Sequence, residues 1–293
     1  MELLSGTRLG QIEILPQTES LYHYTTAKAL MNIVSTNEFW VTHANFLNDY
    51  SEINYIEEVA REAVHMLIPD SRTAEEFGGS LIEQFCKIRE GFHQMYLLSF
   101  STLADSLILW SEFSGGFGYC MELCVGDLRR HLHVQGESFR YYSEGRVVYD
   151  RSRQAAIIRD EILYPWMPKG NLSSQSEEVR QVLPAMAMSL YEYAPFFKRA
   201  AFQNEEEYRF IFYCAEDSAG TPDFCSFREK DGNIIPFVKI NLKLDYKTKL
   251  PIRSIVAGPK NKSDLAIRGA QYLLACHGYG ETTIKKSGLT LRY

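Results

Sequence analysis

The sequence predicts an α+β fold in which a mixed, largely antiparallel sheet carries helical insertions. Apolar residues make up 45% of the 293 positions and charged residues 23%, which are ordinary values for a chain with a packed core. Regular alternation of strands and helices is typical of a parallel sheet, and the segments of this chain do not alternate in that way. Neither G-x-G-x-x-G after a strand nor G-x-x-x-x-G-K-[ST] occurs, so Rossmann and P-loop folds have no support. We expect a single domain over residues 1–293.

The expected strands are short segments rich in β-branched and aromatic residues. In chain order they cover residues 21–24, 39–43, 95–101, 117–125, 146–150, 207–214, 235–241, 252–257 and about 281–285. The expected helices have apolar residues at every third or fourth position. They cover about 27–35, 49–67, 73–89, 105–112, 151–164, 176–194 and 263–276. Two helical stretches, at about 49–90 and 151–195, are expected to be insertions that flank or cover the sheet.

Composition also restricts the class of protein. The net charge of −6 argues against a broad non-specific nucleic-acid surface, which needs a basic field, although a local basic cleft stays compatible with it. The six cysteines form no Cys-x-x-Cys pair and have no zinc-finger spacing, so we expect reduced thiols. The N-terminal residues do not resemble a signal peptide, and no window approaches the ~20 apolar residues of a membrane span. We therefore expect a cytoplasmic protein without membrane contact.

The first polar cluster is LYHYTT at residues 21–26, on the first expected strand. His23 lies between Tyr22 and Tyr24, so its side chain points to the opposite face from theirs. One interpretation is a cleft histidine that binds a ligand hydroxyl. The other is a core histidine whose ring bonds a backbone carbonyl.

Two further clusters follow along the chain. Asn48 and Asp49 form a turn and helix-cap signal, and Asn48 can also reach into a site from that loop. Ser99 and Ser101 are two positions apart on one strand face, where hydroxyls can brace a carboxylate or bind a ribose or phosphate. Trp110, on the following helix, either fills a core or stacks on a ligand.

The fourth cluster, in FQNEEEYRFIFY at residues 202–213, has three consecutive glutamates before an apolar strand. Alternation places Glu205 and Glu207 on one face and Glu206 on the other. A carboxylate pair at a strand end suits the stabilisation of positive charge at a sugar anomeric carbon. The alternative is a solvated acidic strand start in which Arg209 is a salt-bridge partner.

In this order the clusters resemble an uncharacterised bacterial family with the pattern L-Y-H-Y-T, L-N-D-x-x-E, S-F-S with a following Trp, and E-x-E-Y-R. The chain has these motifs at residues 21–25, 47–52, 99–101 with Trp110, and 205–209. That family is in turn distantly similar to NAD-dependent ADP-ribosyltransferases. The resemblance therefore implies an ADP-ribosyltransferase-like fold with NAD as a substrate.

The same resemblance implies roles for individual residues. Glu207 would bond the nicotinamide ribose and favour loss of nicotinamide, and Glu205 would orient or deprotonate the acceptor. His23 would hold the adenosine ribose, and Ser99 and Ser101 would brace the site. The full set implied to contact the cofactor is His23, Tyr24, Thr25, Asn48, Ser99, Ser101 and Trp110.

Three hypotheses follow. The first is an ADP-ribosyltransferase, a toxin or phage-defence effector that modifies a protein or nucleic acid, and it requires His23, Ser101 and Glu207 to converge in one cleft. The second is a non-catalytic module that binds a nucleotide or senses a partner. The third is a metal-dependent hydrolase whose ligands are Asp49, Glu52, Glu205 and Glu207. No spacing supports that third set specifically, so we expect no metal.

Overall fold

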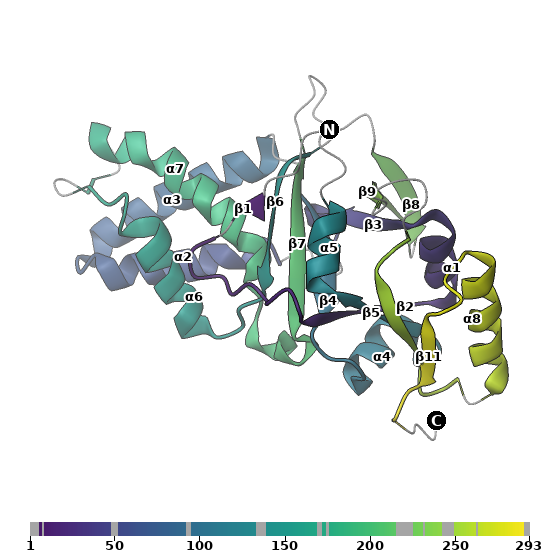
Figure 1. Cartoon of the computed structure of the whole chain (residues 1–293). Coiled ribbons are helices and arrows are strands. Elements are labelled where there is room, and N and C mark those ends of the chain that lie inside the picture. The colour runs from purple at the N-terminus through teal and green to yellow at the C-terminus, as the bar shows by residue number, and fades with distance from the viewer. Residues whose placement is uncertain are drawn as a thin grey trace.

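The computed structural model describes residues 6–7, 9–47, 52–91, 95–132, 139–168, 172–173, 176–214, 225–230, 232–241, 249–261 and 263–289. Over these residues the chain is a mixture of helices and strands around one largely antiparallel sheet, as predicted (Figure 1). The helices gather in two places, one on each side of the sheet.

Eleven strands of the described part form the sheet. They are β1 (Gly6–Thr7), β2 (Ser20–Thr25), β3 (Glu38–His43), β4 (Met95–Ser101), β5 (Tyr119–Cys124), β6 (Phe139–Arg146), β7 (Glu207–Cys214), β8 (Ser226–Lys230), β9 (Asn233–Asn241), β10 (Ile252–Ala257) and β11 (Thr283–Lys286). The main path runs β1-β6-β7-β4-β2-β5-β10-β11, and β3 joins β4 to β9, which pairs with β8. Only the β1–β6 and β10–β11 pairs are parallel among these pairings.

The α-helices are α1 (Ala27–Thr36), α2 (Tyr55–Leu67), α3 (Ser71–Gly91), α4 (Leu107–Ser114), α5 (Val125–His131), α6 (Arg151–Ile157), α7 (Glu177–Tyr193) and α8 (Asp264–Cys276). A π-helical segment, η3 (Ile158–Leu163), continues α6. Short 3₁₀ turns are η1 (Ala44–Phe46), η4 (Ala194–Phe196) and η5 (Ala200–Glu205). Side-chain caps start four of the described helices, from Thr26 for α1, Asp70 for α3, Asp150 for α6 and Ser176 for α7.

Three sequence predictions need correction or fall outside the described residues. The strand expected at 146–150 is instead the end of β6 at Arg146, after which Val148 makes only a single bridge to Phe197. Strand β8 lies where no strand was expected, because its polar residues give no strand signal. The cap expected at Asp49 lies outside the described residues, and α2 begins at Tyr55.

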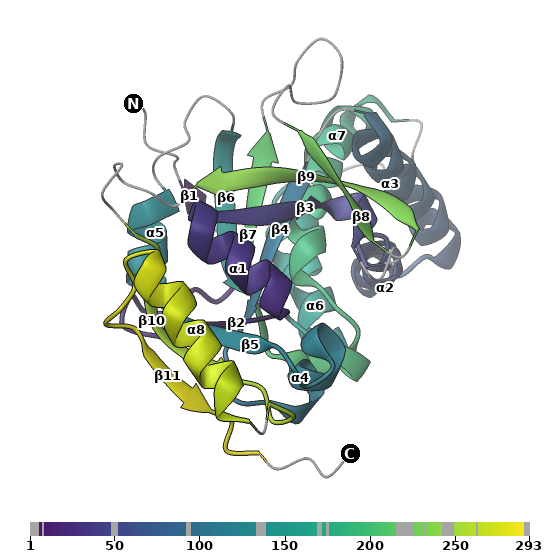
Figure 2. The same cartoon turned by 90° about the vertical axis from the view of Figure 1, so that its right-hand side faces the viewer.

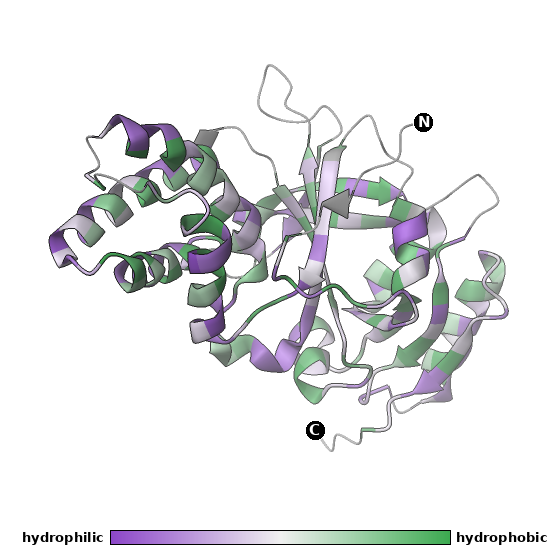
Figure 3. Ribbon diagram, turned by 60° about the vertical axis from the view of Figure 1, so that its left-hand side comes forward, coloured by the Kyte–Doolittle hydropathy of each residue, from purple (hydrophilic) through white to green (hydrophobic). Residues whose placement is uncertain are grey.

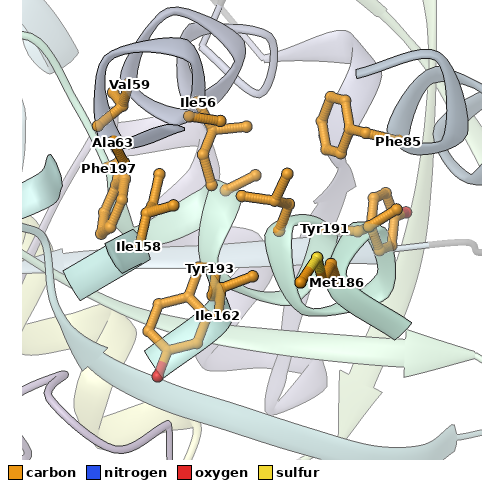
Figure 4. Close-up of a cluster of buried hydrophobic side chains, with 14 of the residues drawn as sticks. Ile56, Val59, Ala63, Phe85, Ile158, Ile162, Met186, Tyr191, Tyr193 and Phe197 are labelled. Atoms are coloured by element: carbon orange, nitrogen blue, oxygen red, sulfur yellow. The ribbon is translucent and has the colours of Figure 1, made fainter. Parts of the chain in front are cut away.

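The two helical stretches expected around 49–90 and 151–195 form one layer. Helices α2 and α3 lie beside α6 and α7, although the two pairs are far apart in the sequence (Figures 1 and 3). Their apolar sides meet in a buried cluster that includes Ile56, Phe85, Ile158 and Met186 (Figure 4). The cluster continues onto Ile211 of β7, so this layer packs on one face of the sheet.

Two names describe the sheet below. The glutamate face carries Glu207, Ser101 and Tyr22, which lie directly opposite one another on β7, β4 and β2. The histidine face carries the alternate residues, including His23 and Tyr208. Apolar residues of α1, α5 and α8 pack on the histidine face, and α1 and α8 lie across the sheet in Figure 2. Helix α4 packs on the glutamate face through Trp110.

The sheet divides at β4. At one end β4 pairs with β2 through Tyr22 and Ser101, and at the other end it pairs with β3 through Thr42 and Leu97. Between these points neither neighbour continues the ladder. A backbone carbonyl left there needs another donor, and the Ser99 carbonyl is bonded by the His23 ring.

Candidate functional site

The glutamate cluster lies where η5 turns into β7. Glu206 adopts a left-handed conformation with φ 46, and this turn separates the end of η5 from the first residue of β7. Glu205 and Glu207 are consequently both buried, whereas Glu206 is exposed. The prediction that Glu205 and Glu207 share a side is met, but a turn rather than strand alternation achieves it.

Two buried cations hold this glutamate pair. The Lys198 Nζ donates to Glu205 Oε2 and to Glu207 Oε1, each at 2.6 Å. The Arg209 Nε donates to Glu207 Oε2 at 2.6 Å, and its Nη2 pairs with Glu52 just before α2. We call these five residues the glutamate network. It connects β7, η5, the segment after η4 and the start of the helical layer.

Backbone contacts fix the same residues. The Ser101 hydroxyl donates to the Glu205 carbonyl at 2.7 Å and accepts from the Leu103 amide at 3.1 Å. The Tyr149 hydroxyl accepts from the Glu207 amide at 3.0 Å. The Ser101 hydroxyl therefore positions the glutamate turn by bonding the backbone of Glu205 and not its carboxylate.

Charge balance explains the ionisation of the pair. Burial, the hydrogen bond to Glu207 and the negative charge of Glu207 raise the pKa of Glu205 to about 8, against the opposing effect of Lys198. Burial opposes ionisation of Glu207 too, but Arg209, Glu205 and Lys198 together hold the pKa of Glu207 well below its usual range. Glu52 and Glu207 balance Lys198 and Arg209, so a charge on Glu205 has no cation left to compensate it.

His23 lies on the other face. Its ring packs against Phe39 and Phe100 with centroids 5.2 and 5.6 Å away, and its Nδ1 is 3.3 Å from the Ser99 carbonyl. Burial lowers the pKa of His23 to about 4, so the ring is neutral at pH 7. Thr25 shares this face by alternation and is buried. This is the arrangement of a core histidine that bonds a backbone carbonyl.

The three residues that the transferase hypothesis needs in one cleft are therefore not assembled. Ser101 and Glu207 are direct neighbours across β4 and β7, and Ser99 is likewise opposite Arg209. His23 lies on the histidine face, where its ring contacts Phe39 and Phe100. On the glutamate face, the residue of β2 opposite Ser101 is Tyr22.

Tyr24 and Trp110 belong to a small apolar cluster beneath α4. Their rings meet edge to face at 4.9 Å, and Trp110 Nε1 donates to Asp105 at 2.6 Å. The Tyr24 hydroxyl donates to the Leu103 carbonyl at 2.8 Å. Trp110 is completely buried, so it fills a core here. Asn48 lies outside the described residues.

Lys198 and Tyr149 were missed by the sequence analysis. The one available signal for Lys198 was its position directly after the apolar pair Phe196 and Phe197, which suggests burial. A buried lysine normally has a charged partner, so the signal pointed to nearby carboxylates. Arg209 was considered only as a surface partner of the glutamates, and it is in fact 2% exposed.

Two further observations concern metals and membranes. Among the residues that the structure describes, no group of three or more potential ligands could hold a metal ion. Glu52 is kept apart from the glutamate pair by Arg209, which bonds both Glu52 and Glu207. The helices of the described part include none of the length and apolarity needed to cross a bilayer.

Comparison with known protein families finds a match over part of the chain. A family model described as a protein of unknown function, DUF2971, matches residues 109–210. The matched region contains Trp110, Lys198 and the whole E-x-E-Y-R segment, whereas His23 and the two serines of β4 precede it. No curated protein and no solved structure matches the chain. The resemblance to an uncharacterised family is thus supported over the segment that supplies most of the glutamate network.

Proposed function

We propose that the glutamate network is an acid–base site that acts on the glycosidic bond of a nucleotide, with NAD-dependent ADP-ribosyl transfer as the reaction. The observation that supports this proposal is the opposite shift of two neighbouring carboxyls. Glu205 has a pKa of about 8 and Glu207 is held ionised beside it. Neighbouring groups whose pKa values are pushed apart are typical of acid–base pairs, although structural ion pairs also produce them.

The two carboxyls fit different steps of that reaction. Ionised Glu207 stabilises the positive charge that develops at the ribose anomeric carbon as its bond to nicotinamide breaks. The acceptor then forms a bond to that carbon and gives up its proton. The ionised form of Glu205 accepts this proton. A pKa of about 8 is close to the value that a general base needs near neutral pH.

The proposal carries a structural requirement. Glu207 is buried and each of its oxygens already accepts from a cation, Oε1 from Lys198 and Oε2 from Arg209, so a ribose hydroxyl reaches a remaining lone pair only when surrounding side chains move aside. The Lys198 side chain also lies over the ring of Phe202, 4.7 Å from its centroid. His23 has no part in this version of the site, and Ser101 acts as a positioning residue for Glu205.

A second candidate is a nucleotide-binding or sensor module without turnover. The occupied oxygens of Glu207 favour it, and so does the position of His23 on the opposite face. In this case the network is structural. Substitution of Glu207 then leaves ligand affinity nearly unchanged wherever the fold survives.

The test is to incubate the purified protein with NAD and a cell lysate and to follow free nicotinamide by mass spectrometry. Glu207→Gln is compared with Glu206→Gln, which changes the exposed neighbouring glutamate. Nicotinamide release that Glu207→Gln abolishes and Glu206→Gln preserves supports the enzyme. A mass gain on a lysate component then distinguishes transfer from hydrolysis. Equal background release in all three proteins contradicts catalysis and favours the binding module.

The biological setting belongs to the same proposal. A transferase that acts on cellular protein or nucleic acid, as a toxin or a phage-defence effector does, should slow growth when expressed. Expression of the wild-type chain should therefore lower culture density relative to Glu207→Gln at equal protein level. Equal growth of the two cultures would argue against an effector of this kind.

A further inference from the structure

A second polar surface lies on the three-stranded unit of β3, β9 and β8, which branches from β4 (Figure 2). Its register places Trp40 opposite Lys239 and Thr42 opposite Phe237. Phe237 is in turn opposite Ser226, and Arg228 is opposite Ile235. All these side chains share one face of the unit by alternation. We call it the Trp40 face.

An aromatic stack and an arginine form the centre of the Trp40 face. Trp40 stacks on Phe237 with centroids 4.4 Å apart and planes 22° apart. The Arg228 guanidinium lies 5.8 Å from the centroid of the same Phe237 ring. It reaches across β9 to donate to the Thr42 hydroxyl at 2.7 Å. Trp40 remains 36% exposed, whereas Phe237 beneath it is buried.

Arg228 has no counterion within the described part of the chain. No carboxylate pairs with it there, and its buried Nε has no hydrogen-bond partner. Burial lowers the pKa of Arg228, and no neighbouring charge offsets this effect. Half-buried arginines are normally paired, as Arg129 is with Glu144. A guanidinium that no described carboxylate pairs with is suited to bind an anionic ligand.

The other charged residues on this face include two lysines, which favour an anionic ligand, and one glutamate. Lys239 is exposed beside Trp40 and Lys230 is exposed at the end of β8. Glu38, two residues before Trp40, is the acidic residue of β3 on this face. In a chain of net charge −6, Arg228 and Lys239 on the same face as an exposed indole form a local departure from the overall balance.

We infer that the Trp40 face binds a nucleotide unit, with the base stacked on Trp40 and the phosphate paired with Arg228 and Lys239. A flat base gains from an indole whichever base it is, and a guanidinium matches phosphate oxygens. The unit can belong to a free mononucleotide or to a single-stranded nucleic acid. The inference goes beyond the proposed function, because no residue of the glutamate network takes part.

The test uses fluorescence anisotropy with a labelled oligothymidylate of about twelve nucleotides at low salt. Trp40→Leu should weaken binding about tenfold or more, in line with the loss of one stacked base. Trp166→Leu, which changes another partly exposed tryptophan, should leave affinity unchanged. Lys239→Gln changes a fully exposed position and should reduce the slope of log affinity against log salt by roughly 0.7. The control for this variant is Lys87→Gln, which changes an exposed lysine of α3.

Competition with AMP distinguishes the two sources of the ligand. Displacement of the oligonucleotide by AMP supports a mononucleotide site, and a failure to displace it supports a site for single strands. The inference is wrong if neither probe binds at low salt. It is also wrong if Trp40→Leu and Trp166→Leu weaken binding equally while Lys239→Gln has no effect on the salt slope.

Discussion

Adjacent residues of β7 contribute to two buried ionic clusters on opposite faces of the sheet. On the histidine face, Tyr208 donates to Glu144 at 2.6 Å, and Arg129 donates to the other Glu144 oxygen at 2.6 Å. On the glutamate face, Arg209 joins the glutamate network. The first cluster pairs one cation with one carboxylate, and the second combines two cations with three carboxyls.

This difference in number decides how each cluster responds to protons. In the Arg129 cluster every charge has a partner, and burial beside Glu144 raises the pKa of Tyr208 above its usual range. In the glutamate network the third carboxyl has no cation of its own, so Glu205 titrates near neutral pH. The two clusters teach that charge count, rather than burial alone, gives a buried site its proton-transfer capacity.

The largest expected effect comes from removing the central cation of the glutamate network. Arg209→Met leaves Glu52 and part of Glu207 buried without a partner, and breaking such a pair costs about 3–5 kcal/mol of unfolding free energy. Urea unfolding at pH 7 measures the loss. Arg129→Met is the matched change in the other cluster and should lose less, because Glu144 keeps its bond to Tyr208 and Arg129 is partly exposed. Equal losses would remove the distinction between the clusters.

The second prediction concerns pH. The pKa of Glu205 is about 8 in the folded chain and about 4.3 when unfolded, so the folded state holds one more proton between these values. The contribution of Glu205 to stability must therefore fall as pH rises through this window, by at most about 1.4 kcal/mol per pH unit, and level off above pH 8. His23 and His43 act in the opposite direction up to their unfolded pKa of about 6.5, because burial lowers the pKa of each to about 4 in the folded chain. The low pKa of Glu207 has its effect only below the unfolded value, where stability falls as pH decreases.

Glu205→Gln should remove this contribution, so the stability of the wild type relative to Glu205→Gln should fall between pH 5 and pH 8. Glu144→Gln, which removes a carboxyl from the balanced cluster, should keep the wild-type slope although its overall stability is lower. Urea midpoints at unit pH intervals give both slopes. An unchanged slope in Glu205→Gln would mean that Glu205 is ionised in the folded chain and is not a base poised near neutral pH.

The sequence predicted the α+β fold class from local patterns. It also placed Glu205 and Glu207 on one side, although the left-handed turn at Glu206 and not strand alternation brings them together. Alternation also correctly placed His23 on the opposite face from Tyr22 and Tyr24. Local patterns do not say which face of a strand meets which neighbour. The register of β4 with β7 and β2 decides that, and it places Tyr22 rather than His23 beside Ser101 and Glu207.

The partners of the glutamate pair could not be predicted for a related reason. Glu52 lies 157 positions from Arg209, and only the packing of the helical layer on the sheet brings the two together. Lys198 is nearer in sequence, but its approach depends on η4 and on the left-handed turn at Glu206. Strand β6 was missed because Ser143, Glu144 and Gly145 interrupt the apolar pattern. Glu144 belongs to the Arg129 cluster, Ser143 shares a hydrogen bond with the Tyr213 hydroxyl, and Gly145 is closely packed against Ile12.

A third prediction examines the balanced cluster directly. Tyr208→Phe removes the hydroxyl that bonds both Glu144 and Arg129, and an unsatisfied buried acceptor costs about 1–3 kcal/mol. Because the pKa values of Tyr208 and Arg129 are both raised above their usual ranges, neither changes charge near neutrality and the loss should be equal at pH 5.5 and pH 8. A loss that varies with pH would show that the Arg129 cluster also exchanges protons and would contradict the contrast drawn from charge count.

The smallest expected effect is at Glu206, whose turn brings Glu205 beside Glu207. Its φ of 46 is unfavourable for a residue with a Cβ, and its contact with Arg146 is an exposed pair 3.7 Å long that adds little. Glu206→Gly should therefore have a higher unfolding free energy than Glu206→Ala, by up to about 1 kcal/mol, as measured by urea unfolding. The pH slope should persist in both variants, since the turn is kept. If Glu206→Gly lost the slope, the glutamate pair would depend on the Glu206 side chain and not on the turn alone.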